Sequence, residues 1–244
     1  MKTLYRYPLL IIFCFCLFSG MQLKAQIIND LLQTATNVIS KSSLSNDEIV
    51  KGLKEALNVG TNNSVASASK TDGFLKNAAI KIVFPSDARD METQLRNIGM
   101  GEQCDKFVET LNRGAEEASK SAATIFINAV TNMTISDGIK LLNGGDNAAT
   151  QYLKDNTSSQ LKSAFTPIVK AALAKVKLTE YWNPLASTYN KLPFVKKVNP
   201  DLDAYVTDKT IDGLFKLIAN EEYKIRKDPA ARVSDILKKV FGAK

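Results

Sequence analysis

One stretch, Glu102–Thr131, constrains the possible folds of this chain more than any other part of the sequence. Its apolar and small residues recur at alternating steps of four and three, which places them along one side of an α-helix. Such a helix would be roughly 45 Å long and, with small residues in its middle, would let other helices pack closely against it. Because Thr124–Val130 is rich in β-branched residues, an end of the helix before this run is the alternative. The stripe consists of Cys104, Val108, Leu111, Ala115, Ala118, Ala122, Ile125 and Ala129.

Most of the remaining sequence also has helical periodicity. Ser45 and Glu48 form a capping-box pattern before an amphipathic segment that we expect to end near Gly60. Ile80–Pro85 is the only strand-like run, and no clear partner strand accompanies it. The sequence therefore predicts an all-α fold, with one multi-helix, bundle-like domain around the long central helix and at most one short strand-like segment. Further helices are expected at 148–156, from 157 or 158 onward with a kink or a start at Pro167, at 201–227 and at 230–241.

The first 25 residues have the pattern of a secretory signal peptide. Lys2 and Arg6 make the start basic, Leu9–Phe18 is apolar but too short to span a bilayer comfortably, and Ala25 offers a small residue for cleavage. An uncleaved anchor is the alternative. We expect an exported protein, periplasmic or associated with the cell envelope, with no transmembrane segment after cleavage. The expected organisation is a signal peptide at 1–25, a helical lead-in at 26–43 and a single helical domain at 44–242.

Composition excludes several classes of function. The sequence has no histidine, which rules out Ser-His-Asp and Cys-His catalysis and the histidine-containing zinc and di-iron sites. Cleavage after Ala25 would remove three basic residues and no acidic one, so the formal net charge would fall from +7 to +4. A surplus that small does not indicate nucleic-acid binding. Cys104 would be the only cysteine left, on the apolar stripe, which favours a buried packing role. We predict neither a metal nor a cofactor.

A polar row beside the apolar stripe is the best candidate for a site. Spacing places its four residues on neighbouring faces of the same helical turns, and it places a carboxylate of the last long helix on that helix's buried side. One interpretation joins them in a polar pocket between helices, where a carboxylate of raised pKa would act as acid or base. The other, which we favour, is a structural network of ion pairs. The candidates are Glu109, Asn112, Arg113, Glu116, Glu221, Glu222, Arg226 and Arg232.

Several short motifs, taken together and in order, resemble a family of exported bacterial proteins known as domain of unknown function 4197. The resemblance covers about residues 44–242 and implies export and a helical fold, but no activity and no catalytic residue. The motifs are Gly52–Leu57 with Gly60, Gly73–Phe74, Ile82 with Pro85, Leu111–Arg113 with Glu116, Met133–Thr134 with Asp137, Ala148–Thr150 with Tyr152, Tyr205–Thr207, Gly213–Phe215, Glu221–Glu222 with Ile225–Arg226, Pro229 with Arg232, and Val240–Gly242.

Three functions stay open at this point. The leading hypothesis is a non-catalytic envelope protein that binds a small molecule or an envelope-protein partner. The second is a carboxylate-based hydrolase with Glu116 or Glu222 as general base and Arg113 as anion anchor. The third is a purely structural component of the envelope. The sequence names neither the ligand nor the oligomeric state.

Overall fold

Helices make up most of the described part of the chain, and no strand occurs in it. The computed structural model describes residues 44–136 and 138–242. The chain divides after Ser45, and the unit that begins at Asn46 is described here. Its α-helices are α2 (Asn46–Ala68), α3 (Arg89–Asn97), α4 (Gly101–Ser119), α5 (Ala122–Asn132), α6 (Gly138–Leu142), α7 (Ala148–Lys175), α8 (Leu178–Tyr189), α9 (Leu202–Lys227) and α10 (Asp235–Gly242), and its 3-10 helices are η1 (Ser86–Ala88) and η2 (Pro229–Ala231).

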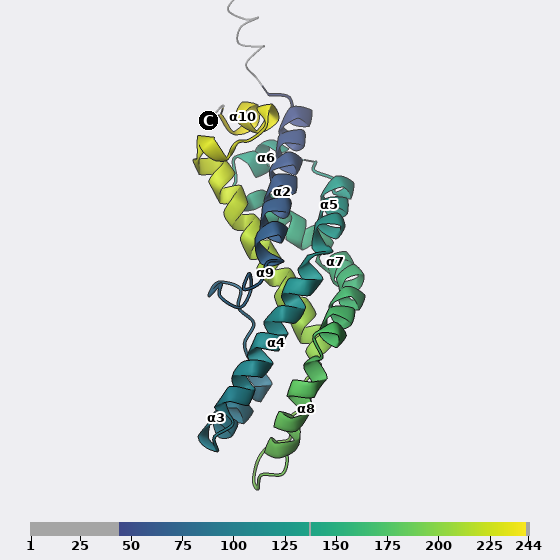
Figure 1. Ribbon diagram of the computed structural model, residues 1–244. Coiled ribbons are helices and arrows are strands. Elements are labelled where there is room, and N and C mark those ends of the chain that lie inside the picture. Colours follow the sequence, from purple (N-terminus) through teal and green to yellow (C-terminus); the bar gives the residue numbers. More distant parts are fainter. Residues whose placement is uncertain (1–43, 137, 243–244) are drawn as a thin grey trace, which may run out of the picture. The chain divides into compact units, whose positions relative to one another are not determined.

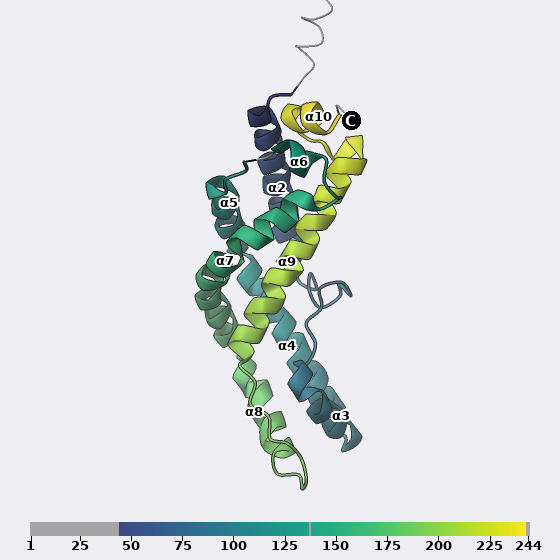
Figure 2. The ribbon, with the colours of Figure 1, turned by 180° about the vertical axis from the view of Figure 1, so that it is seen from behind.

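Helix α9 is the element that most of the unit packs against. It contacts α2 and α7 along much of its length, and also α4 and α10 (Figures 1 and 2). Its buried apolar residues face these neighbours, and the ring of Phe215 meets that of Phe126 on α5 edge to face, with 5.2 Å between centroids. The predicted all-α fold is therefore confirmed, but its centre is α9 together with α4.

The predicted central helix over 102–131 is two helices, because a turn at Lys120 and Ser121 separates α4 from α5. The N–H groups of both turn residues donate to carbonyls three residues earlier, the tighter pattern that often ends a helix. The Ser119 hydroxyl also donates to the carbonyl of Ala115. The break therefore lies before the β-branched run, where the Ser119 hydroxyl competes for a backbone carbonyl.

Two other helix boundaries differ from those expected. Helix α2 continues past Gly60 to Ala68, because the glycine lies where α9 approaches closely and a Cβ there would be 3.3 Å from that of Glu221. Helix α7 is continuous from Ala148 to Lys175 and contains Pro167. Packing of α7 against α4 and α9 stabilises it as one helix despite the proline. Predictions for residues 1–43 and for Asp137 lie outside the described residues.

The strand-like run is an extended segment that has no partner strand in the described part of the chain. Ile80, Ile82 and Phe84 are buried, whereas Lys81 and Val83 are exposed, so the side chains alternate as in a strand. Gly213 of α9 allows the segment to approach, since a Cβ there would be 3.2 Å from that of Ile80. The segment therefore lies against the helices and borders a groove described below. Among the described helices, none is long and apolar enough to cross a membrane.

Candidate functional site

Arg113 links α4 to the turn that follows α2. Its guanidinium donates to Oδ1 of Asp72 and to Oε2 of Glu116, both at 2.7 Å. Glu116 is 4% exposed, and its other oxygen accepts from the backbone N–H groups of Phe74 and Leu75. Bonds from Lys76 and Arg113 hold the pKa of the Asp72 carboxyl below its usual value. The cluster fixes a turn in which Asp72 has a φ of 68°, a conformation uncommon for residues other than glycine.

The other two members of the predicted row have different partners. Asn112 is fully buried and bonds both backbone groups of Ile82, accepting from its N–H at 2.8 Å and donating to its carbonyl at 2.7 Å. The Asn112 amide thus satisfies the backbone groups of Ile82 that a neighbouring strand would otherwise bond. Glu109 is half-exposed and pairs with Lys106 at 3.0 Å, which lowers the pKa of its carboxyl. Neither side chain is free for chemistry.

Glu222 and Arg226 of α9 form a second, separate cluster with α6 and α7. The Glu222 carboxylate is fully buried and accepts from the N–H groups of Ala149 and Thr150 in the first turn of α7, and from the Thr150 hydroxyl. Arg226 donates to the same carboxylate and to the last two carbonyls of α6, those of Leu141 and Leu142. Together they cap the end of one helix and the start of the next.

Arg232 and Glu221 also have structural partners. Arg232 donates to the carbonyls of Ile225 and Arg226 at the end of α9. Glu221 accepts from the side chains of Asn63 on α2 and of Lys224. The bonds of Arg232 and of Asn63 therefore connect the carboxyl-terminal half of α9 to the segment that follows it and to α2.

The structure thus brings Arg113 and Glu116 together, with Glu109 and Lys106 beside them, but it does not join them to Glu222. Both oxygens of Glu116 and both of Glu222 already accept hydrogen bonds from donors that are buried or partly buried. A general base needs an accessible oxygen within reach of its substrate. The geometry favours the structural interpretation of these residues over the hydrolase hypothesis.

A hollow of about 410 Å³ lies beside α4, and we call it the paired hollow. Its walls carry three cations and three carboxylates, and each cation bonds a carboxylate within the hollow. The pairs are Lys106 with Glu109, Arg113 with Glu116, and Lys120 with Glu117 at 2.6 Å. Charge in this hollow is therefore balanced within the protein itself.

A second hollow of about 300 Å³ lies between the extended segment and α9, and we call it the basic groove. Its floor includes Ile82 and Phe84, and Gly213 leaves room at its side. Tyr205 forms part of one wall, where its hydroxyl donates to the carbonyl of Val83 at 3.0 Å. Burial raises the pKa of this phenol, so it stays protonated and keeps the segment in place.

Charge in the basic groove is strongly one-sided. Its only carboxylate, Asp212, is bonded to Lys154 outside the groove at 2.8 Å. None of the four cations pairs with a carboxylate in the described part of the chain. Lys209 lies over the Tyr205 ring, and Lys216 donates to a backbone carbonyl. Lys81 and Arg89 have no ion pair among the described residues. Such a groove attracts anions. The cations are Lys81, Arg89, Lys209 and Lys216.

Our sequence analysis missed the basic groove. A signal for half of it was present, since Tyr205, Lys209, Asp212 and Lys216 are separated by four, three and four residues and so share one face of α9. The other half was not predictable, because Lys81 and Arg89 lie before α4 and reach α9 only through the fold. No group of three or more Cys, Asp or Glu side chains in the described ranges is arranged to hold a metal ion.

Comparison with known proteins identifies the family. Searches of curated proteins and of solved structures give no match. A family model described as a protein of unknown function (DUF4197) matches residues 43–242, a range that includes every residue that we describe. This agrees with the resemblance carried by the short motifs, and the chain belongs to the DUF4197 family.

Proposed function

We propose that this chain is a non-catalytic binding protein of the bacterial cell envelope, and that it binds a multiply charged anion, such as a phosphate ester, in the basic groove. The observation that carries the proposal is the set of four cations without carboxylate partners around a hollow of about 300 Å³. Unpaired cations held near one another repel, and a bound anion removes that repulsion. The location in the envelope is supported by the signal-peptide pattern of residues 1–25.

The placement of the charged side chains around the groove supports a role in binding without catalysis. Its cations come from the extended segment, from α3 and from α9, so they surround a ligand from more than one side. Arg89 offers a planar fork of donors suited to a phosphate or carboxylate, and the lysines add point charges. The one carboxylate in the groove is bonded to Lys154, which leaves it poorly placed to take a proton from a substrate.

Calorimetric titration of the purified protein with sodium pyrophosphate tests this function. We expect saturable binding that weakens as salt is added. The double variant Arg89→Gln/Lys209→Gln should bind at least about tenfold more weakly, because it removes two direct charges. The matched control, Lys106→Gln/Lys120→Gln, removes the same charge from the paired hollow and should bind like the wild type.

Two results would overturn the proposal. The first is an absence of saturable heat with pyrophosphate for a folded wild-type protein. The second is an equal loss of affinity in both double variants, which would show that only net charge matters. Circular dichroism of every variant verifies that it is folded.

A further inference from the structure

The connector between α8 and α9, residues 190–200, projects an aromatic side chain into solvent. Phe194 is fully exposed, at 107% of its reference area, and is the most exposed of the large hydrophobic residues described. Its φ of 63° is also unusual, since residues other than glycine seldom adopt the left-handed conformation. An aromatic ring held in this way gains nothing from the fold of its own chain.

The projection is built into the fold, because the base of the connector is closed. The Asn190 side chain accepts from the N–H of Val198 at 3.1 Å and donates to its carbonyl at 3.3 Å. Val198 itself is buried, as is Tyr189 at the end of α8. The N–H of Leu192 also bonds the carbonyl of Tyr189. The connector is therefore a closed loop that presents Phe194 at its tip.

The tip is surrounded by positive charge. Lys191, Lys196 and Lys197 are exposed, and none of them forms an ion pair in the described residues. The connector contains no Asp or Glu between Asn190 and Pro200. The next carboxylate, Asp201, accepts from the N–H of Ala204 as the N-cap of α9. An exposed aromatic ring with three lysines around it is the combination found where proteins meet anionic lipid.

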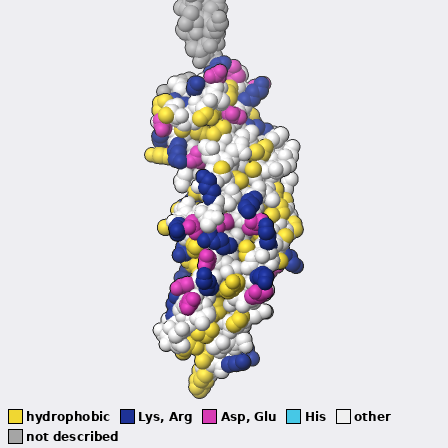
Figure 3. All heavy atoms as spheres, in the orientation of Figure 1, with side chains coloured by type: hydrophobic (Ala, Val, Ile, Leu, Met, Phe, Trp, Pro, Cys, Tyr) yellow, Lys and Arg dark blue, Asp and Glu magenta, His cyan; other side chains and the backbone are white. Residues whose placement is uncertain are grey.

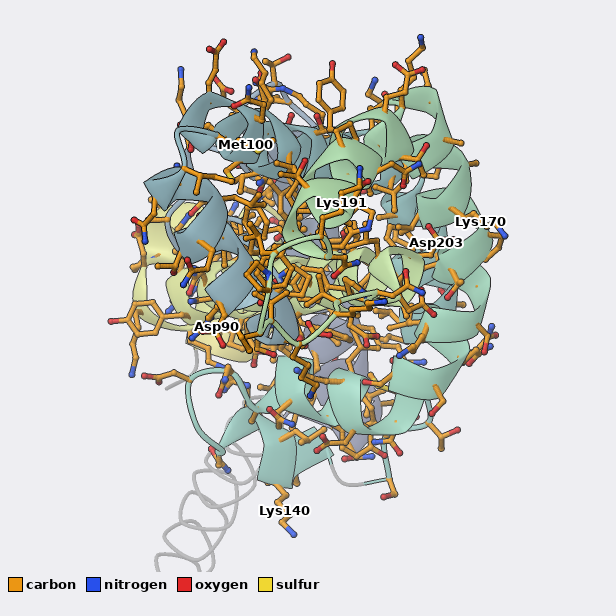
Figure 4. All side chains as sticks on the ribbon, turned by 90° about the horizontal axis from the view of Figure 1, so that it is seen from below. Asp90, Met100, Lys140, Lys170, Lys191 and Asp203 are labelled. Carbon is orange, nitrogen blue, oxygen red and sulfur yellow. The ribbon has the colours of Figure 1, made fainter. Side chains whose placement is uncertain are left out.

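A second apolar side chain lies at the same end of this unit. Figures 1 and 2 both place the α3–α4 turn and the α8–α9 connector at the lower end, and α3 and α8 are in contact. The turn exposes half of Ile98, at 51%. Figure 3 shows hydrophobic atoms at the lowest point of the view with a basic side chain just above them. Figure 4 looks onto this end from below and labels Met100 of the turn and Lys191 of the connector.

We propose that this end of the protein docks on a bilayer that contains anionic lipids. Phe194 enters the headgroup region, and Lys191, Lys196 and Lys197 contact lipid phosphates around it. A protruding tip suits a deformable lipid surface, whereas a protein partner with affinity for one ring needs a matching pocket. This docking goes beyond the anion binding proposed for the basic groove and uses none of the groove's residues.

Flotation with lipid vesicles tests the docking. The purified protein should float with vesicles of phosphatidylcholine and phosphatidylglycerol, and much less with phosphatidylcholine alone. Phe194→Ser should reduce partitioning at least about fivefold, because burial of the ring is lost. Lys196→Glu/Lys197→Glu should reduce it by a similar or larger factor, since each lysine near the surface contributes to binding.

Matched controls separate docking from general charge and hydrophobicity. Val233→Ser removes an exposed apolar side chain elsewhere, and Lys51→Glu/Lys170→Glu makes the same change in net charge on α2 and α7. Both controls should float like the wild type. Arg89→Gln/Lys209→Gln should also float, so that failure of the groove proposal and failure of the docking give different results.

A fluorescent reporter tests insertion directly. Trp182 is the only tryptophan and is buried, so Phe194→Trp adds one exposed reporter. Its emission should shift to shorter wavelength with phosphatidylglycerol vesicles and be quenched by brominated acyl chains. The docking is overturned if folded wild-type protein does not float with these vesicles, if Phe194→Ser floats equally well, or if the reporter emission does not change.

Discussion

The paired hollow and the basic groove differ in whether their cations are paired with carboxylates. In the hollow beside α4, each of the three cations has a carboxylate within bonding distance. Two of these charged residues also hold the turn after α2, since Arg113 bonds Asp72 and Glu116 accepts from the N–H groups of Phe74 and Leu75. In the groove along α9, four cations face a single carboxylate that is bonded to a residue outside it. The charges of the paired hollow are neutralised within the protein, whereas those of the basic groove stay available to a ligand.

The difference explains why the candidate residues chosen from the sequence belong mainly to the scaffold. Polar residues on the buried side of a helix need partners, so burial by itself selects groups that are already bonded. Glu116 and Glu222 are both of this kind, since each accepts backbone N–H bonds in addition to an arginine. Groups kept for a ligand are expected to be exposed and unpaired in the free protein.

The largest expected effect comes from the buried pair on α9. Glu222→Ala should lower the free energy of unfolding by about 3–5 kcal/mol, because it leaves Arg226 buried without its carboxylate and two N–H groups of α7 without an acceptor. Urea denaturation followed by circular dichroism measures the loss. The adjacent Glu221→Ala is the control, and it should cost about 1 kcal/mol or less because its pair with Lys224 is near the surface. A loss below about 1 kcal/mol for Glu222→Ala would contradict a structural role.

A smaller, pH-dependent effect on stability is expected at Arg113, which lines the paired hollow. Arg113→Ala should cost about 2 kcal/mol at neutral pH, since Glu116 loses a charge-assisted bond. Arg113 also helps to lower the pKa of Asp72 below its ordinary 3.8. A lowered carboxyl pKa stabilises the folded state above the unfolded pKa, and this stability is lost as the pH falls through the folded pKa. The difference between variant and wild type should therefore shrink as the pH falls below about 4.

Urea denaturation at a series of pH values measures that difference. Arg96→Ala is the matched control, because Arg96 also bonds two carboxylates, Glu92 and Asp105, but at a more exposed site. The control should cost less than about 1 kcal/mol at neutral pH. Equal losses for the two variants would mean that the Arg113 cluster contributes no more than a surface pair.

The sequence was sufficient for the fold class and for several individual contacts. Helical periodicity is local, so it predicted the all-α fold and the buried faces of α4 and α9. It also placed Glu222 on the buried side of its helix and Arg226 within reach of it, four residues later. It did not predict the break at Lys120 and Ser121, because the apolar spacing continues across the break without interruption.

The basic groove required the fold. Lys81 and Arg89 are separated from Lys209 and Lys216 by more than a hundred residues, and periodicity does not report which distant segments meet. Asn112 illustrates the same limit, since its spacing placed it beside Arg113 but its bonds go to Ile82. A helix face is a local property, whereas the partner of that face depends on tertiary packing.

The smallest expected effect on stability is that of the groove variant, and it distinguishes the basic groove from the paired hollow most clearly. Arg89→Gln/Lys209→Gln should change the free energy of unfolding by less than about 0.5 kcal/mol, because neither side chain has an ion pair to lose. A slight gain in stability is expected, since four cations of like charge repel across the groove, and it should disappear as added salt screens that repulsion. Urea denaturation at low and high salt measures both. Loss of more than about 1 kcal/mol would place these cations in the scaffold with Arg113, and the distinction between the hollow and the groove would fail.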